Sequence, residues 1–170
     1  MSWALETAQN PSVLRLHART ELTRMTIERC PPASPPEMLE PVLALDAVRS
    51  VDLHRYRARV NLAAGVEALG VLPSIERLLA DRMGPAEPLP PDPPPQAYPV
   101  EYEEPRIVAE SLEMAGDHSM LRALFETQGV VEAILGTGLL LVRLGRLFTW
   151  EECGPAVQQA LDSGPAGPGR

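Results

Sequence analysis

The chain has 170 residues, a net charge of −8 and a pI near 4.9, a balance that disfavours general nucleic-acid binding, which normally needs an excess of basic residues. Hydrophobic residues make up 45% of the sequence and aromatic residues only 4%, so Leu, Val, Ile and Ala must build any core. All fifteen basic residues are Arg, which together with abundant Ala, Pro and Gly is typical of a GC-rich bacterial genome.

No secretory or membrane segment is predicted. Residues 1–7 lack a basic region followed by an apolar one, as a signal peptide requires. The most apolar stretch, residues 138–148, is interrupted by Arg143 and Arg146 and is shorter than the roughly 20 residues that span a bilayer. We therefore expect a soluble cytoplasmic protein.

Residues 1–82 are predicted to form a first α+β module. Alternating apolar residues indicate strands, and apolar residues at helical spacing after a capping residue indicate helices. The expected elements are strands at Val13–Ala18 and Met25–Arg29, a helix capped by Ser34 that ends near Leu45, a hairpin of Val48–Leu53 and Tyr56–Leu62 turning at His54 and Arg55, and a helix at Gly70–Arg82 with Pro73 in its first turn.

A proline-rich segment, residues 83–99, is predicted to be a stiff linker, because proline fixes φ and removes the backbone donor. Residues 100–163 then repeat the pattern, and 164–170 are expected to be a disordered tail. The expected elements are strands at Val100–Tyr102 and Arg106–Ser111, a helix capped by Asp117 or Ser119, a hairpin of Val130–Leu135 and Leu139–Leu144, and a helix capped by Thr149 with Glu152 in a capping box.

The two modules are related by a gap-free internal repeat. Sliding the chain along itself lays 22–81 over 104–163, with identical pairs along the whole overlay that include Val60 with Val142 and Pro73 with Pro155. The sequence therefore predicts a tandem duplication of an α+β unit, each copy a ββαββα module with a mainly antiparallel sheet and both helices on one face.

Two stretches resemble the N-terminal domain of the Nfu/NifU family. Residues 6–16 (ETAQNPSVLRL) are similar to the opening of that domain, an Asn-Pro turn that runs into a strand. Residues 125–161 are similar to its close, with GVVEAILGTGLLLVRL followed by Thr149, Trp150, Pro155 and a final apolar helix. The resemblance implies a scaffold-type domain and a setting in iron–sulfur cluster assembly or delivery.

The cluster-binding part of that family is absent from the sequence. The resemblance implies that a separate domain carries a CxxC pair, whereas this chain has only Cys30 and Cys153, one in each module. Cluster ligation needs several closely spaced thiolates. In the repeat, these cysteines lie opposite Leu112 and Val71, which are core-type positions, so we expect small buried side chains and no bound metal or cofactor.

Catalytic patterns are also missing. The three histidines share no ligand spacing, no serine lies in a GxSxG context, and no glycine-rich phosphate loop is present. We therefore expect a protein that is not an enzyme.

One strand carries a distinctive charge pattern. Arg55, Arg57 and Arg59 alternate with apolar residues that should face the helices, so the arginines should lie on the open side of the sheet. Three interpretations remain open: the row binds an acidic partner segment, binds a nucleic-acid backbone, or pairs with nearby carboxylates.

The second module carries apolar residues on the equivalent face. Ile134, Leu139 and Leu141 should lie there, and such a surface is seldom left in water. We expect it to pack against the sister module or the same surface of a second chain, as in a homodimer. The sequence predicts an adaptor or scaffold that acts by protein–protein contact; the alternative is a small nucleic-acid-binding or regulatory protein that uses residues 55–59.

Overall fold

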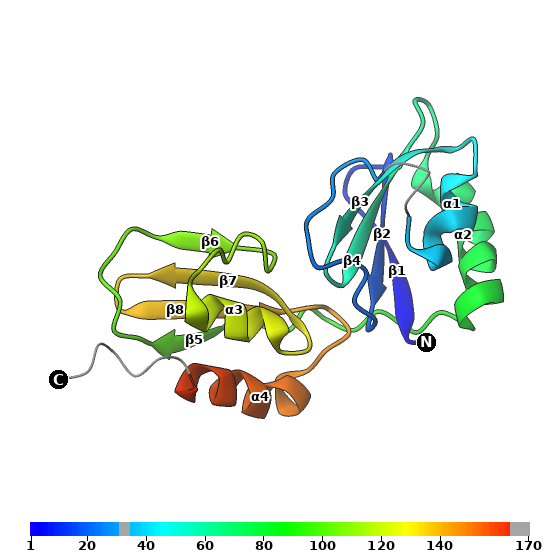
Figure 1. Ribbon diagram of the computed structural model, residues 1–170. Coiled ribbons are helices and arrows are strands. Elements are labelled where there is room, and N and C mark those ends of the chain that lie inside the picture. Colours follow the sequence, from blue (N-terminus) through cyan, green and yellow to red (C-terminus); the bar gives the residue numbers. More distant parts are fainter. Residues whose placement is uncertain (31–34, 164–170) are drawn as a thin grey trace. The chain divides into compact units, whose positions relative to one another are not determined.

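The computed structural model describes residues 1–30 and 35–163 and has a mixed α+β architecture. It divides into two compact units, Met1–Pro90 and Pro91–Arg170, called unit 1 and unit 2 below. Each unit contains one four-stranded antiparallel sheet and two α-helices among its described residues (Figure 1). The division between Pro90 and Pro91 falls inside the predicted linker, residues 83–99.

Unit 1 places its strands in the order β1-β2-β4-β3, with each neighbouring pair antiparallel. Its elements are β1 (Trp3–Thr7), β2 (Val13–Ala18), a 3-10 turn η1 (Glu37–Leu39), α1 (Glu40–Leu43), β3 (Val48–His54), β4 (Arg57–Leu62) and α2 (Ala68–Met83). The core lies between one face of the sheet and the helices, where Leu14, Leu16 and Val60 meet Leu39 and Ile75.

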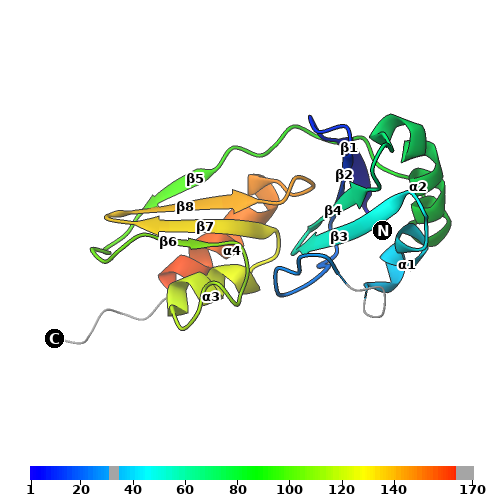
Figure 2. The same cartoon turned by 90° about the horizontal axis from the view of Figure 1, so that it is seen from above.

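Unit 2 places its strands in the order β5-β8-β7-β6, also antiparallel throughout. Its elements are β5 (Gln96–Pro99), β6 (Ile107–Ala109), α3 (Ser119–Glu126), β7 (Val130–Gly136), β8 (Leu139–Leu144) and α4 (Trp150–Asp162). Figure 2 shows α3 and α4 on the same side of this sheet. Leu121, Leu124 and Val157 from the helices and Leu140 and Val142 from β8 are all fully buried.

The two units agree in detail along their shared part. Strands β7 and β8 begin and end at the positions that the internal repeat lays over the ends of β3 and β4. The bulge between Val48 and Ser50 recurs between Val130 and Glu132. Strand β5 pairs with β8 in the register that β2 makes with β4, since Gln96 opposes Val142 as Leu14 opposes Val60.

The loops show the same correspondence in their backbone hydrogen bonds. The amide of Ala63 donates to the carbonyl of Ala47, and at the equivalent positions of unit 2 Gly145 donates to Gly129, both at 2.8–2.9 Å. Two more backbone hydrogen bonds recur in the same way. In unit 1, the amide of residue 45 donates to the carbonyl of residue 42, and that of 66 to that of 63. In unit 2, the amide of residue 127 donates to the carbonyl of residue 124, and that of 148 to that of 145. The two units therefore share strand register, one bulge and three loop contacts.

The units differ at the edges of their sheets. Unit 1 has an additional edge strand, β1, which was not predicted. Trp3 fixes this strand, because its side chain is fully buried and its indole Nε1 donates to the Gly84 carbonyl at 2.9 Å. Unit 2 has a regular strand β6 where unit 1 makes only an isolated bridge between Ile27 and Leu53.

The predicted strand at Met25–Arg29 is therefore wrong. Arg29 has a positive φ of 50°, which leaves the extended region, and its amide donates at 2.8 Å to the Asp52 side chain instead of to a strand. The predicted strand at Val100–Tyr102 is also wrong, since the strand is β5, inside the predicted linker. An edge position tolerates Pro99 because one side of an edge strand makes no ladder bonds.

The proline-rich linker is fastened to the units and is not a free spacer. In unit 1 the amide of Glu87 donates to the Trp3 carbonyl at 2.8 Å. In unit 2 the Trp150 indole donates to the Pro94 carbonyl at 2.6 Å, and Arg146 lies 3.4 Å from Asp92.

The helix boundaries confirm one predicted cap and correct others. Thr149 and Glu152 form the expected capping box of α4. The N-cap of α3 is His118, which makes no side-chain cap bond, so neither Asp117 nor Ser119 has that role. Pro73 and Pro155 lie inside α2 and α4, not in the first turn. The proposed Ser34 cap and the predicted tail at 164–170 lie outside the described residues.

Candidate functional site

Each sheet has one face packed on its helices and an opposite face that we call the open face. Side chains alternate between the two along every strand. In β4 of unit 1, Ala58, Val60 and Leu62 join the core, so Arg57 and Arg59 lie on the open face. The predicted sides of this strand are confirmed.

A row of charged side chains crosses the open face of unit 1. The strand register places Glu6 opposite Arg15, Arg15 opposite Arg59, and Arg59 opposite Asp52. Arg57 is the next open-face residue along β4, where His54 is its partner on β3. We call Arg15, Arg57 and Arg59 the arginine cluster. Arg15 was not identified from the sequence, because only the pairing of β2 with β4 brings it beside the other two.

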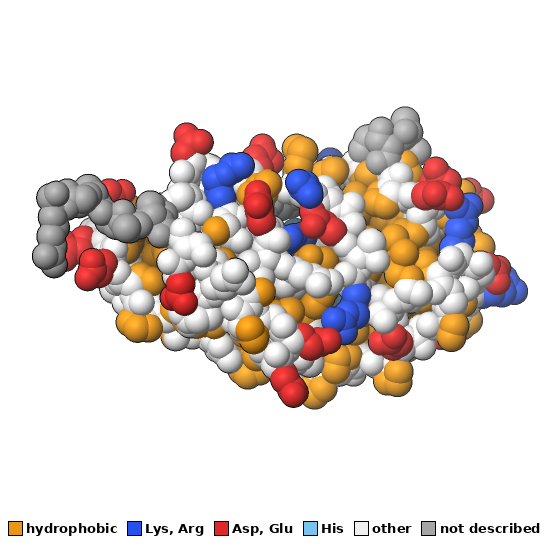
Figure 3. Space-filling view, turned by 60° about the horizontal axis from the view of Figure 1, so that its bottom comes forward, with side chains coloured by type: hydrophobic (Ala, Val, Ile, Leu, Met, Phe, Trp, Pro, Cys, Tyr) orange, Lys and Arg blue, Asp and Glu red, His pale blue; other side chains and the backbone are white. Residues whose placement is uncertain are grey.

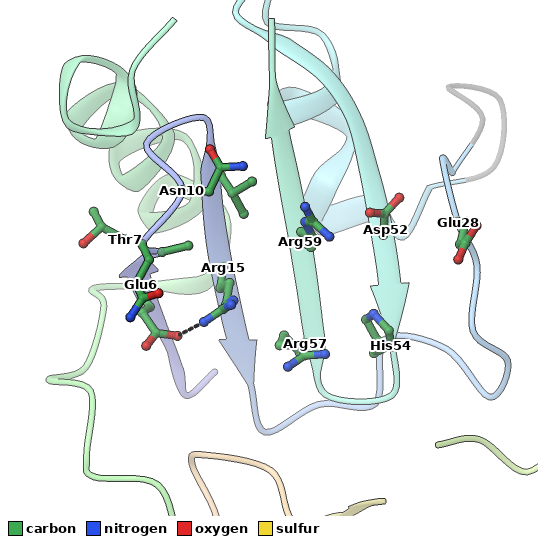
Figure 4. Close-up of a pocket in the computed structure, with 12 residues that line it drawn as sticks. Glu6, Thr7, Asn10, Arg15, Glu28, Asp52, His54, Arg57 and Arg59 are labelled. Atoms are coloured by element: carbon green, nitrogen blue, oxygen red, sulfur yellow. Dashed lines mark ion pairs between the residues drawn. The ribbon is translucent and has the colours of Figure 1, made fainter. Parts of the chain in front are cut away.

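A concavity of about 880 Å³ covers this face. The sheet forms the floor of the concavity. Its walls include Asn10 from the β1–β2 loop and Glu28, which precedes β3 in the sequence and lies beside the outer edge of that strand (Figure 4). A second hollow of about 660 Å³ shares Asn10, Glu28, Asp52 and Arg59 with the first, so the two adjoin. Acidic side chains elsewhere are scattered over the surface, as in the view of Figure 3.

Two carboxylates flank the arginine cluster. Glu6 lies 3.6 Å from the Arg15 guanidinium, an ion pair marked in Figure 4, and 2.9 Å from Nε2 of His17. On the other side, burial alone would raise the pKa of Asp52. The Asp52 carboxylate accepts hydrogen bonds from the backbone amide of Arg29 and the side-chain amide of Asn61, and it lies near the positive charge of Arg59. Together these interactions outweigh the effect of burial and hold the pKa of Asp52 below its usual value.

Arg55 does not belong to the exposed row, which corrects the prediction. The hairpin turns at residues 55 and 56, one position later than expected, so Arg55 leaves the strand alternation. Its side chain is buried, lies 5.1 Å from the Tyr56 ring centroid and is 3.4 Å from Glu21. Arg55 therefore has a local role in packing the turn.

The open face of unit 2 carries an apolar row at the equivalent place. The register puts Val108 opposite Ile134, Ile134 opposite Leu141, and Leu141 opposite Ala97, so the row crosses all four strands. We call Val108, Ile134, Leu139 and Leu141 the apolar face. Leu139 is 48% exposed and Val108 is 38% exposed, while Ile134 and Leu141 are half-buried.

Polar groups limit this apolar face at one end. Glu132 and Arg143 are opposite one another in the register, and their side chains form an ion pair at 2.8 Å. At the other end, the β7–β8 turn passes through Gly138 with φ of 71°, a conformation that glycine adopts without strain. The predicted hairpin of residues 130–135 and 139–144 is confirmed, with its turn at residues 137 and 138.

The cysteines lie in separate units and are both buried, as their core-type positions predicted. Cys30 belongs to the unit 1 core, and burial raises the pKa of its thiol, which keeps it protonated at neutral pH. Within residues 1–30 and 35–163, no three His, Cys, Asp or Glu side chains are grouped so that they could hold a metal ion.

Comparison with known proteins gives no relative. No known protein family, curated protein or solved structure matches the chain. None of the helices in the described part of the chain is long and apolar enough to cross a membrane.

Proposed function

We propose that this protein is a non-enzymatic adaptor that acts by protein–protein contact through the open faces of its two sheets. The observation that carries the proposal is the apolar face of unit 2, where the side chains of four aliphatic residues on β6, β7 and β8 lie on the side of the sheet opposite its helices. Fully burying a Leu or Ile side chain is worth roughly 1.5–3 kcal/mol. A partner that covers this face therefore gains substantial free energy from it.

The occupant that we propose for the apolar face is the same face of a second chain. A two-fold axis through the row would stack two sheets at the spacing of about 10 Å that is usual for face-to-face sheets. The charge at the end of the face is already neutralised internally by Glu132 and Arg143, so two copies meet without unpaired like charges from this pair. A two-fold dimer is also the commonest symmetric assembly.

Analytical ultracentrifugation of the Leu139→Arg, Leu141→Arg double variant tests this proposal. We expect the parent to sediment as a dimer at micromolar concentration and the double variant as a monomer, because two guanidinium groups would be buried without partners. Leu69→Arg is the matched control, since Leu69 is 74% exposed on α2 of unit 1, whereas the apolar face belongs to unit 2. If both variants keep the parent's sedimentation coefficient, the apolar face is not the contact.

We further propose that the two units descend from one duplicated ββαββα module. The shared strand register, the recurrent bulge and the three recurrent loop contacts support this proposal, and β1 is then an addition to unit 1. The resemblance to the Nfu/NifU N-terminal domain, and with it a role in iron–sulfur cluster assembly, stays a prediction from residues 6–16 and 125–161. Anaerobic reconstitution with iron and sulfide should leave the purified protein without a stable cluster; a coloured, stoichiometric species lost in Cys30→Ser would contradict that prediction.

A further inference from the structure

We infer that the arginine cluster on the open face of unit 1 binds one carboxylate group of an acidic side chain, presented by a segment of a partner protein. This inference rests on the proposed function, because it names the chemistry of a partner for an adaptor. It concerns the other unit and a different surface, so it can fail while the dimer contact holds.

The first argument is the direct opposition of two arginines. Arg15 and Arg59 face one another across the β2–β4 pair, and like charges at such positions destabilise a sheet. The chain has 23 acidic residues and 15 basic ones, so an acidic residue opposite an arginine would be the commoner charged pair. An anion between the two guanidinium groups converts the repulsion into two attractions.

The second argument is the size of the positive region. Adjacent strands lie about 4.8 Å apart, and alternate residues on one strand about 7 Å apart. Arg15, Arg59 and Arg57 are therefore the corners of a small triangle, which the long arginine side chains can close around a single carboxylate. Arginine presents its donors as a planar fork that matches a carboxylate with two parallel hydrogen bonds.

The flanking carboxylates argue against a polyanion. Along the row, Glu6 and Asp52 lie on either side of the two arginines, about 14 Å apart at the strand spacing. Glu28 adds a third negative charge on the wall of the concavity. A nucleic-acid backbone that crossed this face would meet these carboxylates on both sides, whereas a lone carboxylate at the centre meets only the arginines.

The charge of the lining also disfavours a phosphate. Among the residues that line the concavity, three arginines, Arg15, Arg57 and Arg59, stand against three carboxylates, Glu6, Glu28 and Asp52, so the lining has no formal excess of positive charge. A phosphate, with a charge of about −1.5 to −2 at neutral pH, would therefore meet more repulsion from these carboxylates than a singly charged carboxylate does.

Titration of the full chain, followed by the NMR signals of the arginine Nε–H groups, tests the inference. The probes are four: a capped hexapeptide with one central glutamate, the same peptide with glutamine, the same peptide with phosphoserine, and a single-stranded DNA hexanucleotide. We expect the glutamate peptide to shift the Arg15 and Arg59 signals with saturation and the other three to leave them nearly unchanged.

Two variants with opposite expected effects separate binding from folding. Arg59→Ala should weaken binding of the glutamate peptide at least about tenfold, because a charge-assisted hydrogen-bonded pair is lost. Asp52→Asn should strengthen binding of this peptide about two- to fivefold, because Asp52 competes with the peptide for Arg59. A merely destabilising change would not tighten binding. Arg77→Ala, an exposed arginine on α2, is the matched control and should have no effect.

Three results would overturn the inference. Equal shifts with the glutamate and glutamine peptides would show that charge is not recognised. Saturable shifts with only the phosphoserine peptide or the oligonucleotide would assign another occupant. Weaker binding by Asp52→Asn, with an unchanged backbone spectrum, would show that Asp52 contributes to binding and does not compete. The Leu139→Arg, Leu141→Arg variant should bind the glutamate peptide as the parent does, which separates this test from that of the dimer.

Discussion

The two open faces occupy equivalent places in their units and have opposite chemistry. Arg59 and Leu141 lie at the same register position, as do Asp52 and Ile134, and Arg15 and Ala97. The helix-covered faces, in contrast, keep their apolar character, with Val60 and Val142 both buried. The difference shows that helix packing restricts one face of such a sheet and leaves the other available for separate binding roles.

A second contrast lies in the loop before β3 and β7. Ala47 in unit 1 and Gly129 in unit 2 accept the same backbone hydrogen bond, yet only Gly129 has a positive φ, of 88°. A Cβ at Gly129 would lie 2.8 Å from the Cys153 sulfur and 2.9 Å from Cγ of Phe148. The aromatic ring that fills the unit 2 core therefore requires glycine, and Val66 at the equivalent place in unit 1 does not.

The largest expected effect tests whether unit 1 depends on its additional strand. Trp3→Ala should lower the free energy of unfolding by about 3–5 kcal/mol, because it empties a fully buried site and removes the bond to Gly84. Trp150→Ala should cost clearly less, since Trp150 is only half-buried. Urea denaturation followed by circular dichroism measures both. A larger loss for Trp150→Ala would show that β1 is dispensable.

The next effect tests the loop contrast. Gly129→Ala should cost about 2–4 kcal/mol, because it combines a close contact in the core with a left-handed backbone. Ala47→Gly should cost no more than about 1 kcal/mol, the usual entropic difference between the two residues. Hydrogen exchange with mass spectrometry would assign the loss to unit 2. Equal effects at both positions would contradict the contrast.

A smaller effect concerns the second helix of each unit. Thr149→Ala should destabilise unit 2 by about 1 kcal/mol, because it removes the capping box of α4. The N-cap of α2 is Glu67, which makes no side-chain cap bond although its backbone is extended. Glu67→Thr should therefore stabilise unit 1 by up to about 1 kcal/mol. A stabilised Thr149→Ala variant in thermal melting would show that the capping box is not needed.

The smallest effect concerns the pH dependence of stability. It compares Asp52 with Ile134, the apolar residue at the equivalent position of unit 2. The pKa of Asp52 is lowered in the folded chain, so its stabilising contribution is present above the unfolded value of about 3.9 and is lost as the pH falls below it. Asp52→Asn should cost less than about 0.5 kcal/mol at pH 7, because solvent screens a partly exposed group. The difference should vanish near pH 2, whereas Ile134→Val should show no such pH dependence.

Local patterns in the sequence determined much of the fold. Strand β2, the two hairpins, the capping box at Thr149 and the burial of both cysteines follow from alternation, turn residues and caps. These features depend on interactions between residues a few positions apart, which a single sequence shows directly. The internal repeat, which lays 22–81 over 104–163, likewise places β3 and β4 over β7 and β8.

The tertiary structure alone decided which distant residues lie together. Arg15 joins Arg57 and Arg59 because β2 pairs with β4. Arg55 is separated from them because the turn falls one residue later than predicted and takes Arg55 out of the strand. Strand β1 forms because the Trp3 side chain and carbonyl find partners at Gly84 and Glu87, at the far end of the unit 1 sequence. The alternation of side chains along a strand determines the face on which a residue lies. Which strands are neighbours depends on the free energy of the whole packed unit, and the pairing of strands determines which residues form a site.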